Sequence, residues 1–288
     1  MIFKKWMAAT ATIALLAGCS AEPAENEETE AEKSAEEAPM ATPEPAKEET
    51  KEEAEPEAEA EPEAEVPEEP AAEATAEPKY RVNAANWRVE PISDAPAEAV
   101  LITIDDAPDD HSVEMATALK ELEVPAIFFV NGHFLDTDEE KENLKKIHEM
   151  GFAIGNHTYT HTNLKTIGEA QQKEEILSLS QTVEEIIGEK PKFFRAPNGS
   201  NTDFSEALVA QEGMLLMNWS YGYDWEKQYM DAAALTDIMV NTEFLGNGSN
   251  LLMHDREWTA AALPGIIKGL SSKGYSFVDP DEIEGITP

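Results

Sequence analysis

The chain contains a single cysteine, Cys19, among its 288 residues. Intrachain disulfides are therefore excluded, whatever the redox state of the compartment. No long apolar run replaces them, since residues 7–17 are too few to span a bilayer as a permanent helix. Basic residues are also scarce: 21 lysines and arginines stand against 59 acids, a formal net charge of −38. This charge argues against nucleic acid as a partner and against tight binding to anionic lipids or wall polymers.

The first nineteen residues have the pattern of an export signal. Two lysines at positions 4 and 5 precede the apolar run, which ends in the sequence LAGC at 16–19. This tetrapeptide resembles a bacterial lipobox, which implies cleavage before Cys19 and attachment of lipid to its thiol. An ordinary signal peptide with a nearby cysteine is the alternative, but the only cysteine falls where a lipobox needs it. We therefore expect a protein anchored by lipid to the extracellular face of the cell membrane.

Residues 20–79 form a spacer of unusual composition. The segment contains 23 glutamates, no aspartate and 4 lysines, a net charge of −19, and most of its other residues are alanine or proline. Such a composition buries too little apolar surface to offset the entropy of ordering, so we expect a disordered, extended tether. The acidic spacer and the absence of an outer-membrane-type region indicate a Gram-positive source.

The remaining 209 residues, 80–288, are enough for one domain with a sizeable core. Apolar strands alternate with amphipathic helices, which predicts a parallel α/β sheet and, with about seven repeats, a (β/α) barrel. Ser112 is expected to be the N-cap of the first helix. Strands are expected at 99–104, 126–130, 152–154, 192–195, 214–219, 250–253 and 276–278. Helices are expected at 112–122, 138–150, 167–187, 203–211, 232–244 and 263–273.

Polar and titratable residues follow the predicted strands, where barrel enzymes carry their functional side chains. Their recurrence after five strands indicates one active rim rather than chance. They are Asp105 and Asp106, Asn156 and His157, Arg195, Asp224 and Trp225, and His254 and Asp255.

His157 and His161 are four residues apart, a spacing that would place both imidazoles on one face of a helical turn. With one carboxylate they would make a three-ligand metal site that leaves a position open. Alone the pair is weak evidence, because surface and core histidines are as common. The adjacent acids Asp105 and Asp106 strengthen it, because two carboxylates in a cleft repel each other unless a cation or an arginine such as Arg195 is near.

These residues resemble the polysaccharide deacetylases of the NodB-homology type, carbohydrate esterase family four. The resemblance runs from about Val100 to Val278 and includes five motifs in order, which implies a distorted (β/α) barrel with fewer than eight strands. The motifs are TIDDAP at 103–108, HTYTH at 157–161, RAPNG at 195–199, DW at 224–225 and LMH at 252–254.

The resemblance implies a role for each matching residue. Asp106, His157 and His161 would hold a divalent metal, typically zinc, although such a donor set also accepts cobalt, nickel or manganese. Asp105 would be the general base, oriented by Arg195. His254 would be the general acid, oriented by Asp224. The substrate side would be formed by Asn198, whose backbone N–H helps to stabilise the oxyanion, its neighbour Pro197, and the acetyl-pocket residues Trp225 and Leu252.

Two positions depart from the family pattern. Ala107 replaces a usual glycine, and Asn198 stands where an aromatic or basic side chain is common. A backbone role for Asn198 survives this change, whereas a substrate contact made by the family's side chain would not.

The resemblance implies removal of N-acetyl groups from an extracellular amino-sugar polymer by a monomeric enzyme. Peptidoglycan N-acetylglucosamine or N-acetylmuramic acid is the first expectation, and chitin oligomers, an exopolysaccharide or O-acetylated sugars are alternatives. A protein of a different class, a non-catalytic metal- or glycan-binding lipoprotein, would need the metal ligands but no separate base and acid. The presence of Asp105, Arg195, Asp224 and His254 favours the enzyme.

Overall fold

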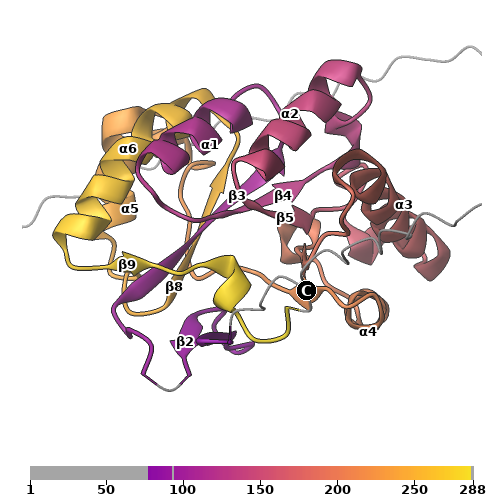
Figure 1. Ribbon diagram of the computed structural model, residues 1–288, viewed down its shortest axis with the longest axis horizontal. Coiled ribbons are helices and arrows are strands. Elements are labelled where there is room, and N and C mark those ends of the chain that lie inside the picture. The colour runs from indigo at the N-terminus through magenta and orange to yellow at the C-terminus, as the bar shows by residue number, and fades with distance from the viewer. Residues whose placement is uncertain (1–76, 93, 287–288) are drawn as a thin grey trace, which may run out of the picture. The chain divides into compact units, whose positions relative to one another are not determined.

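The computed structural model describes residues 77–92 and 94–286, which belong to one unit of the chain (Figure 1). The export signal with Cys19 and the spacer up to residue 76 lie outside the described residues. Lys79, at the end of the predicted spacer, already donates its backbone N–H to the carbonyl of Glu282. No helix in the described part of the chain has the length and apolar character needed to cross a bilayer.

Seven parallel strands form the central sheet, which confirms the predicted α/β class and strand number. The order is β7-β6-β5-β4-β3-β8, and β9 pairs with the start of β3. The strands are β3 (Ala99–Ala107), β4 (Ile127–Val130), β5 (Ala153–Asn156), β6 (Phe193–Phe194), β7 (Leu215–Leu216), β8 (Ser249–His254) and β9 (Ser276–Phe277).

The two ends of this sheet, β7 and β8, approach each other through the segment that follows β7. Tyr221 and Leu251 form a parallel bridge, and the N–H of Leu252 donates to the carbonyl of Tyr221 at 2.9 Å. The sheet is therefore curled into an incomplete barrel, as expected for the distorted (β/α) barrel.

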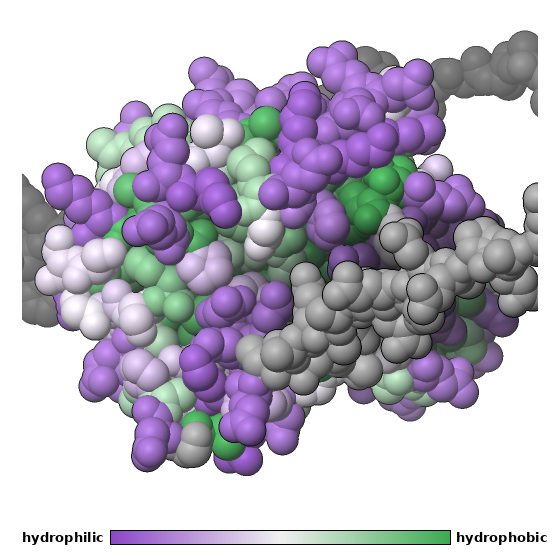
Figure 2. All heavy atoms as spheres, viewed as in Figure 1, coloured by the Kyte–Doolittle hydropathy of each residue, from purple (hydrophilic) through white to green (hydrophobic). Residues whose placement is uncertain are grey.

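Six helices surround the sheet and pack against one another in the order α5, α6, α1, α2, α3, α4. In Figure 1 the helices α1 and α2 lie above the sheet, α5 and α6 lie on its left side, and α3 and α4 lie to its right. Hydrophilic side chains cover the outer side of α2 in Figure 2, and apolar side chains are visible between the hydrophilic ones on the same face. The helices are α1 (Ser112–Glu121), α2 (Asp138–Glu149), α3 (Glu169–Ile187), α4 (Asp203–Gln211), α5 (Ala232–Asn241) and α6 (Glu257–Ser272).

The side chains of strand β3 point alternately to its two faces and so contribute to two separate hydrophobic cores. Ile102 and Ile104 belong to the core beneath the helices, whereas Leu101 belongs to the core inside the barrel, with Phe129 and Phe193. Asp105 follows Leu101 by four residues, so its side chain points to the inner face, at the mouth of the barrel.

An antiparallel pair, β1 (Tyr80–Val82) and β2 (Val89–Pro91), was not predicted. Tyr80 and Val89 are buried in the core inside the barrel, together with Val278 and Ile283 near the C-terminus. The pair therefore covers the end of the barrel opposite the active rim.

Several boundaries differ from the prediction. His111, not Ser112, is the N-cap of α1, and the Ser112 hydroxyl donates to Asp255 instead. Helix α6 begins six residues before the predicted start and accommodates Pro264 in its interior. Strands β6 and β7 are shorter than predicted and pair over only two residues each.

Candidate active site

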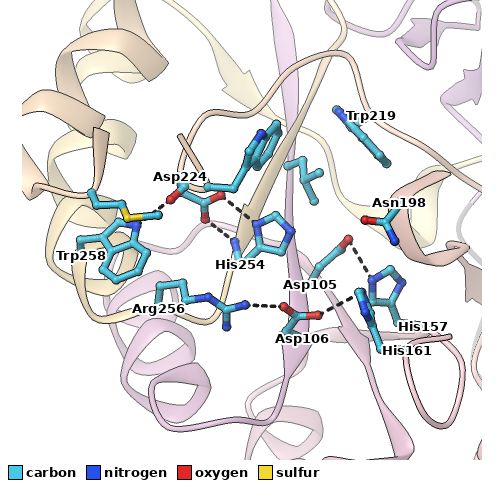
Figure 3. Close-up of a pocket in the computed structure, with 13 residues that line it drawn as sticks. Asp105, Asp106, His157, His161, Asn198, Trp219, Asp224, His254, Arg256 and Trp258 are labelled. Carbon is cyan, nitrogen blue, oxygen red and sulfur yellow. Dashed lines mark hydrogen bonds and ion pairs between the residues drawn. The ribbon is translucent and has the colours of Figure 1, made fainter. Parts of the chain in front are cut away.

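The residues expected at strand ends meet at one edge of the sheet (Figure 3). Asp105 and Asp106 end β3, His157 follows β5, and His254 ends β8. They line a pocket of about 550 Å³. The lining residues are Asp105, Asp106, His157, His161, Asn198, Trp219, Asp224, Trp225, Met230, Leu252, His254, Arg256 and Trp258.

Asp106, His157 and His161 offer ligand atoms that all lie within 4.8 Å of one another, a geometry that suits a metal ion. The Nδ1 of His157 lies 2.7 Å from the carbonyl oxygen of Arg195. Donation from Nδ1 to this carbonyl leaves Nε2 free for a metal, the arrangement typical of histidine ligands. The Nε2 of His161 lies 3.7 Å from Oδ1 of Asp106. The donor set therefore fits the predicted divalent ion.

The two histidines do not lie on a helical turn, so that part of the prediction is wrong. Residues 157–161 form a loop in which Thr158 and His161 have positive φ values of 68° and 58°. The side chain of Asn131 donates to the carbonyls of His157 and Thr158, and the Thr158 N–H donates to the side chain of Asn156. These bonds bring the imidazoles together without helical spacing.

Left-handed backbone is concentrated at the site. Asp106 has a φ of 63° and Asn198 a φ of 55°, in addition to Thr158 and His161. Non-glycine residues rarely adopt this region, and the conformation costs on the order of 1–3 kcal/mol when surrounding contacts impose it. Such strain is typical of functional sites, and the sequence contains no signal for it.

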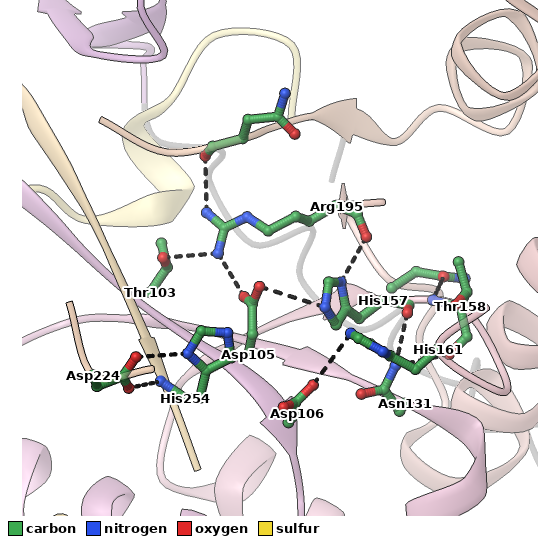
Figure 4. A network of polar contacts seen from close by, with 12 residues as sticks. Thr103, Asp105, Asp106, Asn131, His157, Thr158, His161, Arg195, Asp224 and His254 are labelled. Atoms are coloured by element: carbon green, nitrogen blue, oxygen red, sulfur yellow. Dashed lines mark hydrogen bonds and ion pairs between the residues drawn. The ribbon is translucent and has the colours of Figure 1, made fainter. Parts of the chain in front are cut away.

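Asp105 is held by a buried arginine (Figure 4). Nη1 of Arg195 donates to Oδ1 of Asp105 at 2.5 Å and to the Thr103 hydroxyl at 2.9 Å, while Nη2 donates to the carbonyl of Asn218. The guanidinium lies 4.1 Å from the centre of the Phe129 ring. Burial lowers the pKa of Arg195, although the charge of Asp105 opposes this effect. The arginine thus fixes one oxygen of Asp105 behind the pocket.

The other oxygen of Asp105, Oδ2, lies 3.4 Å from Nε2 of His157. Burial lowers the pKa of His157, which favours the neutral imidazole that metal binding requires. Burial raises the pKa of Asp106, but electrostatic interactions with the three pocket histidines and Arg256 outweigh this effect, and the net pKa is below its usual range.

His254 is paired with Asp224. Nδ1 of His254 lies 2.8 Å from Oδ1 of Asp224, and the backbone N–H of His254 donates to Oδ2 at 2.6 Å. The Thr259 hydroxyl donates to Oδ2 of Asp224, and the Trp258 indole N–H donates to the backbone carbonyl of Asp224. Burial lowers the pKa of His254, yet the hydrogen bond and charge of Asp224 outweigh it and raise the pKa above its usual value.

Asp105 and His254 are direct partners in the parallel ladder between β3 and β8. Two titratable side chains with separate supporting partners therefore stand next to each other at the pocket floor. This register arises from strands far apart in the sequence.

The rest of the pocket wall is largely apolar. The Trp225 ring lies 5.6 Å from the His254 ring at an angle of 88°, and Leu252, which also lines the pocket, is almost completely buried. Asn198 lies on the opposite side, near Trp219 (Figure 3). Pro197 and Arg195 are buried and do not line the pocket.

Four lining residues lie outside the five motifs: Trp219, Met230, Arg256 and Trp258. Met230 and Trp258 lie outside the five motifs, and their apolar side chains resemble ordinary core residues in the sequence. Arg256 follows the last motif by two residues, and only its ion pair with Asp106 reveals it. Asp255 points away from the pocket, where it accepts the backbone N–H groups of His111 and Ser112.

Comparisons with known proteins agree with this geometry. A family model described as polysaccharide deacetylase matches residues 93–217. The chain is 31% identical over 187 residues to a peptidoglycan-N-acetylglucosamine deacetylase from Bacillus cereus, a match that covers 61% of this chain and 67% of that protein. The chain spans about two thirds of the length of the curated relatives it matches.

Two solved structures have the same fold. A family 4 carbohydrate esterase from Streptomyces lividans in complex with acetate matches with a TM-score of 0.57 and 28% identity, over 64% of this chain and 93% of that chain. A CE4 family pseudoenzyme from Bacillus anthracis matches with a TM-score of 0.58 and 26% identity, over 64% of each chain. The five motifs, the curled parallel sheet and these relatives together place the chain in the polysaccharide deacetylase family, carbohydrate esterase family four.

Proposed function

We propose that this protein is a metal-dependent hydrolase that removes N-acetyl groups from an extracellular amino-sugar polymer. The observation that carries the proposal is the ladder pairing of Asp105 with His254, each held by its own partner, beside a possible metal site. A base and an acid next to an electrophilic centre are what amide hydrolysis requires.

Asp106, His157 and His161 are the residues that would hold the metal, with zinc as the first candidate and cobalt, nickel or manganese as alternatives. When bound, a divalent ion at this site would supply Lewis acidity toward the amide carbonyl. The remaining steps belong to the side chains of the pocket.

Asp105 accepts a proton from the water that attacks the carbonyl carbon, and Arg195 orients Asp105 through a hydrogen bond to Oδ1. The backbone N–H of Asn198 is the candidate donor to the developing oxyanion. His254, whose pKa is raised by the hydrogen bond and charge of Asp224, donates its proton to the amine nitrogen as the carbon–nitrogen bond breaks. The products are acetate and a free amino sugar.

The rival function is metal or glycan binding without turnover. This rival is relevant because one matching structure is described as a pseudoenzyme, so membership of the family does not by itself establish activity. A binding protein needs no oriented base and no oriented acid. Both pairs, Asp105 with Arg195 and Asp224 with His254, are intact here, and they support the hydrolase.

Peptidoglycan is the proposed substrate, with N-acetylglucosamine or N-acetylmuramic acid as the reacting sugar. The name of the Bacillus cereus relative supports the first of these. The expected lipid anchor at Cys19 would place a monomeric domain next to the wall of a Gram-positive cell. Chitin oligomers, an exopolysaccharide and O-acetylated sugars would be accommodated by the same machinery.

Acetate release from defined glycans tests the proposal. The protein is incubated with peptidoglycan fragments, chitin oligomers and an O-acetylated xylan, after treatment with chelator and after addition of zinc. We expect zinc-dependent release that is fastest on peptidoglycan. Release from the O-acetylated substrate alone would make the protein an esterase, and no release from any glycan, with zinc bound, would favour the binding protein.

A further inference from the structure

Arg256 occupies an unusual place beside the metal ligands. It is the N-cap of α6, but its side chain does not cap the helix. Its Nη2 donates to Oδ2 of Asp106 at 2.7 Å, and its Nη1 donates to the carbonyl of Asp255 at 2.6 Å. Nη1 also lies 3.9 Å from Oδ2 of Asp109. Two hydrogen bonds within the protein therefore hold the guanidinium in one position.

The two oxygens of Asp106 have different partners. Oδ2 accepts the hydrogen bond from Arg256, whereas Oδ1 lies on the side of His161, 3.7 Å from its Nε2. Figure 3 shows the carboxylate between the guanidinium and the imidazole. Rotation of the carboxylate would break the bond to Arg256, so this bond keeps Oδ1 directed toward the histidines.

We propose that Arg256 is a positioning residue for the metal site, which fixes the Asp106 carboxylate in the orientation that binds the ion. This inference rests on the proposed function only in that Asp106, His157 and His161 hold a divalent metal. Its motivation is the division of labour between the two oxygens of Asp106. Outer partners of metal ligands act in this way, and their loss typically costs 10- to 100-fold in metal affinity or activity.

The charge of Arg256 acts in the opposite direction, because a cation near the site repels the metal. Two features reduce this repulsion. Asp109 supplies a negative charge at 3.9 Å, and the Arg256 side chain is 36% exposed, so that solvent screens it. Orientation is therefore the larger effect, and removing the guanidinium weakens metal binding.

Zinc affinity measured by competition with a chromogenic chelator tests the proposal without any need for turnover. Arg256→Met keeps the unbranched apolar stem of the side chain and removes its donors, and we expect the zinc Kd to rise about 10- to 100-fold. Arg256→Lys, which can still donate to Oδ2, recovers part of this loss. Asp109→Asn is the matched control, since it leaves the bond between Arg256 and Asp106 in place, and its Kd stays within about threefold of the wild-type value.

The thermal unfolding of each metal-free variant shows whether a loss of affinity comes from a loss of folding. A folded Arg256→Met protein with a Kd within about threefold of wild type would overturn the proposal and leave the hydrolase function untouched. Tighter binding by Arg256→Met together with weaker binding by Asp109→Asn would show that charge, not orientation, is the effect of Arg256. A wild-type chain that binds no zinc would overturn this inference and the metal-dependent function together.

Discussion

Asp105 and Asp106 are neighbours in the chain, but they have different surroundings. Asp105 continues the inward face of β3 and meets Arg195, whereas Asp106 has left-handed backbone and lies between His161 and Arg256. The family resemblance predicted different roles for the two acids, and the geometry supplies the physical reason.

Replacement of Asp105 and replacement of Asp106 are expected to have different effects on metal content and turnover. Asp105→Asn should keep the metal and lower the turnover rate by ~10²–10⁴, because only the base is removed. Asp106→Ala should lose the metal and regain part of its activity in excess zinc. Metal content by elemental analysis and the rate of acetate release are measured on both variants. Loss of metal from Asp105→Asn alone would require the two assignments to be exchanged.

The pairing of His254 with Asp224 predicts a change in pH dependence. Burial lowers the pKa of His254, but Asp224, Asp105 and Asp106 raise it overall. A general acid acts in its protonated form, so kcat/KM should fall as pH rises through this pKa. Asp224→Asn removes the main raising effect and should move the alkaline limb to lower pH.

Thr259→Val provides the matched control for this prediction. Thr259 donates to Oδ2 of Asp224, and its replacement leaves the aspartate charge and the His254 bond in place. The alkaline limb should therefore move less than in Asp224→Asn. An unchanged alkaline limb in Asp224→Asn would show that another group is the acid.

Individual residues were predictable to different degrees. The strand-end rule located Asp105, Arg195 and His254, because the positions depend only on where a buried strand stops. The left-handed backbone at Asp106 and the role of Arg256 were not predictable. Both depend on contacts between residues far apart in the chain.

Among the elements, long and strongly patterned ones were predicted well. Strand β3 and helix α3 have apolar periodicity over many residues, and the structure confirms both. Strands β6 and β7 are shorter than predicted. The length of an apolar run in the sequence does not show how many of its residues pair with the adjacent strand of the sheet. The loop 157–161 was mistaken for a helical turn, since histidine spacing alone cannot distinguish a helix from a loop that hydrogen bonds fix.

The unpredicted pair β1–β2 contacts the start of β8 closely at Gly248. This glycine has a φ of 71°, and a Cβ placed there would lie 2.0 Å from the carbonyl oxygen of Val89. Gly248→Ala should therefore lower the free energy of unfolding through two contributions, backbone strain at positive φ and the clash with Val89. The clash should add about 1–3 kcal/mol to the loss that strain alone causes. Denaturant unfolding of the zinc-free protein measures this difference.

Gly274→Ala isolates the strain contribution. Gly274 has a φ of 91°, and no atom lies within 4 Å of the added Cβ. Its replacement should cost about 1–2 kcal/mol, from the left-handed backbone alone. Equal losses in the two variants would show that β2 moves away from Gly248 at little cost.

For the whole molecule, composition separates the chain into a spacer and a domain. The spacer, residues 20–79, is expected to be dispensable for chemistry, since 23 glutamates and no aromatic residue leave it little to pack with. Its deletion should leave turnover on soluble oligosaccharides within about twofold of the full-length rate, measured by acetate release. A much larger loss would mean that the spacer contributes to the folded domain.

The ladder between β3 and β8 has a further consequence. All three candidate metal ligands are encoded between residues 106 and 161, whereas the proposed acid and its partner come from residues 254 and 224. Substitutions confined to the last quarter of the gene can therefore remove the leaving-group acid and leave every candidate metal ligand in place. The proposed base, Asp105, lies beside the candidate ligand Asp106, so only the proposed acid and its partner are encoded apart from the metal site.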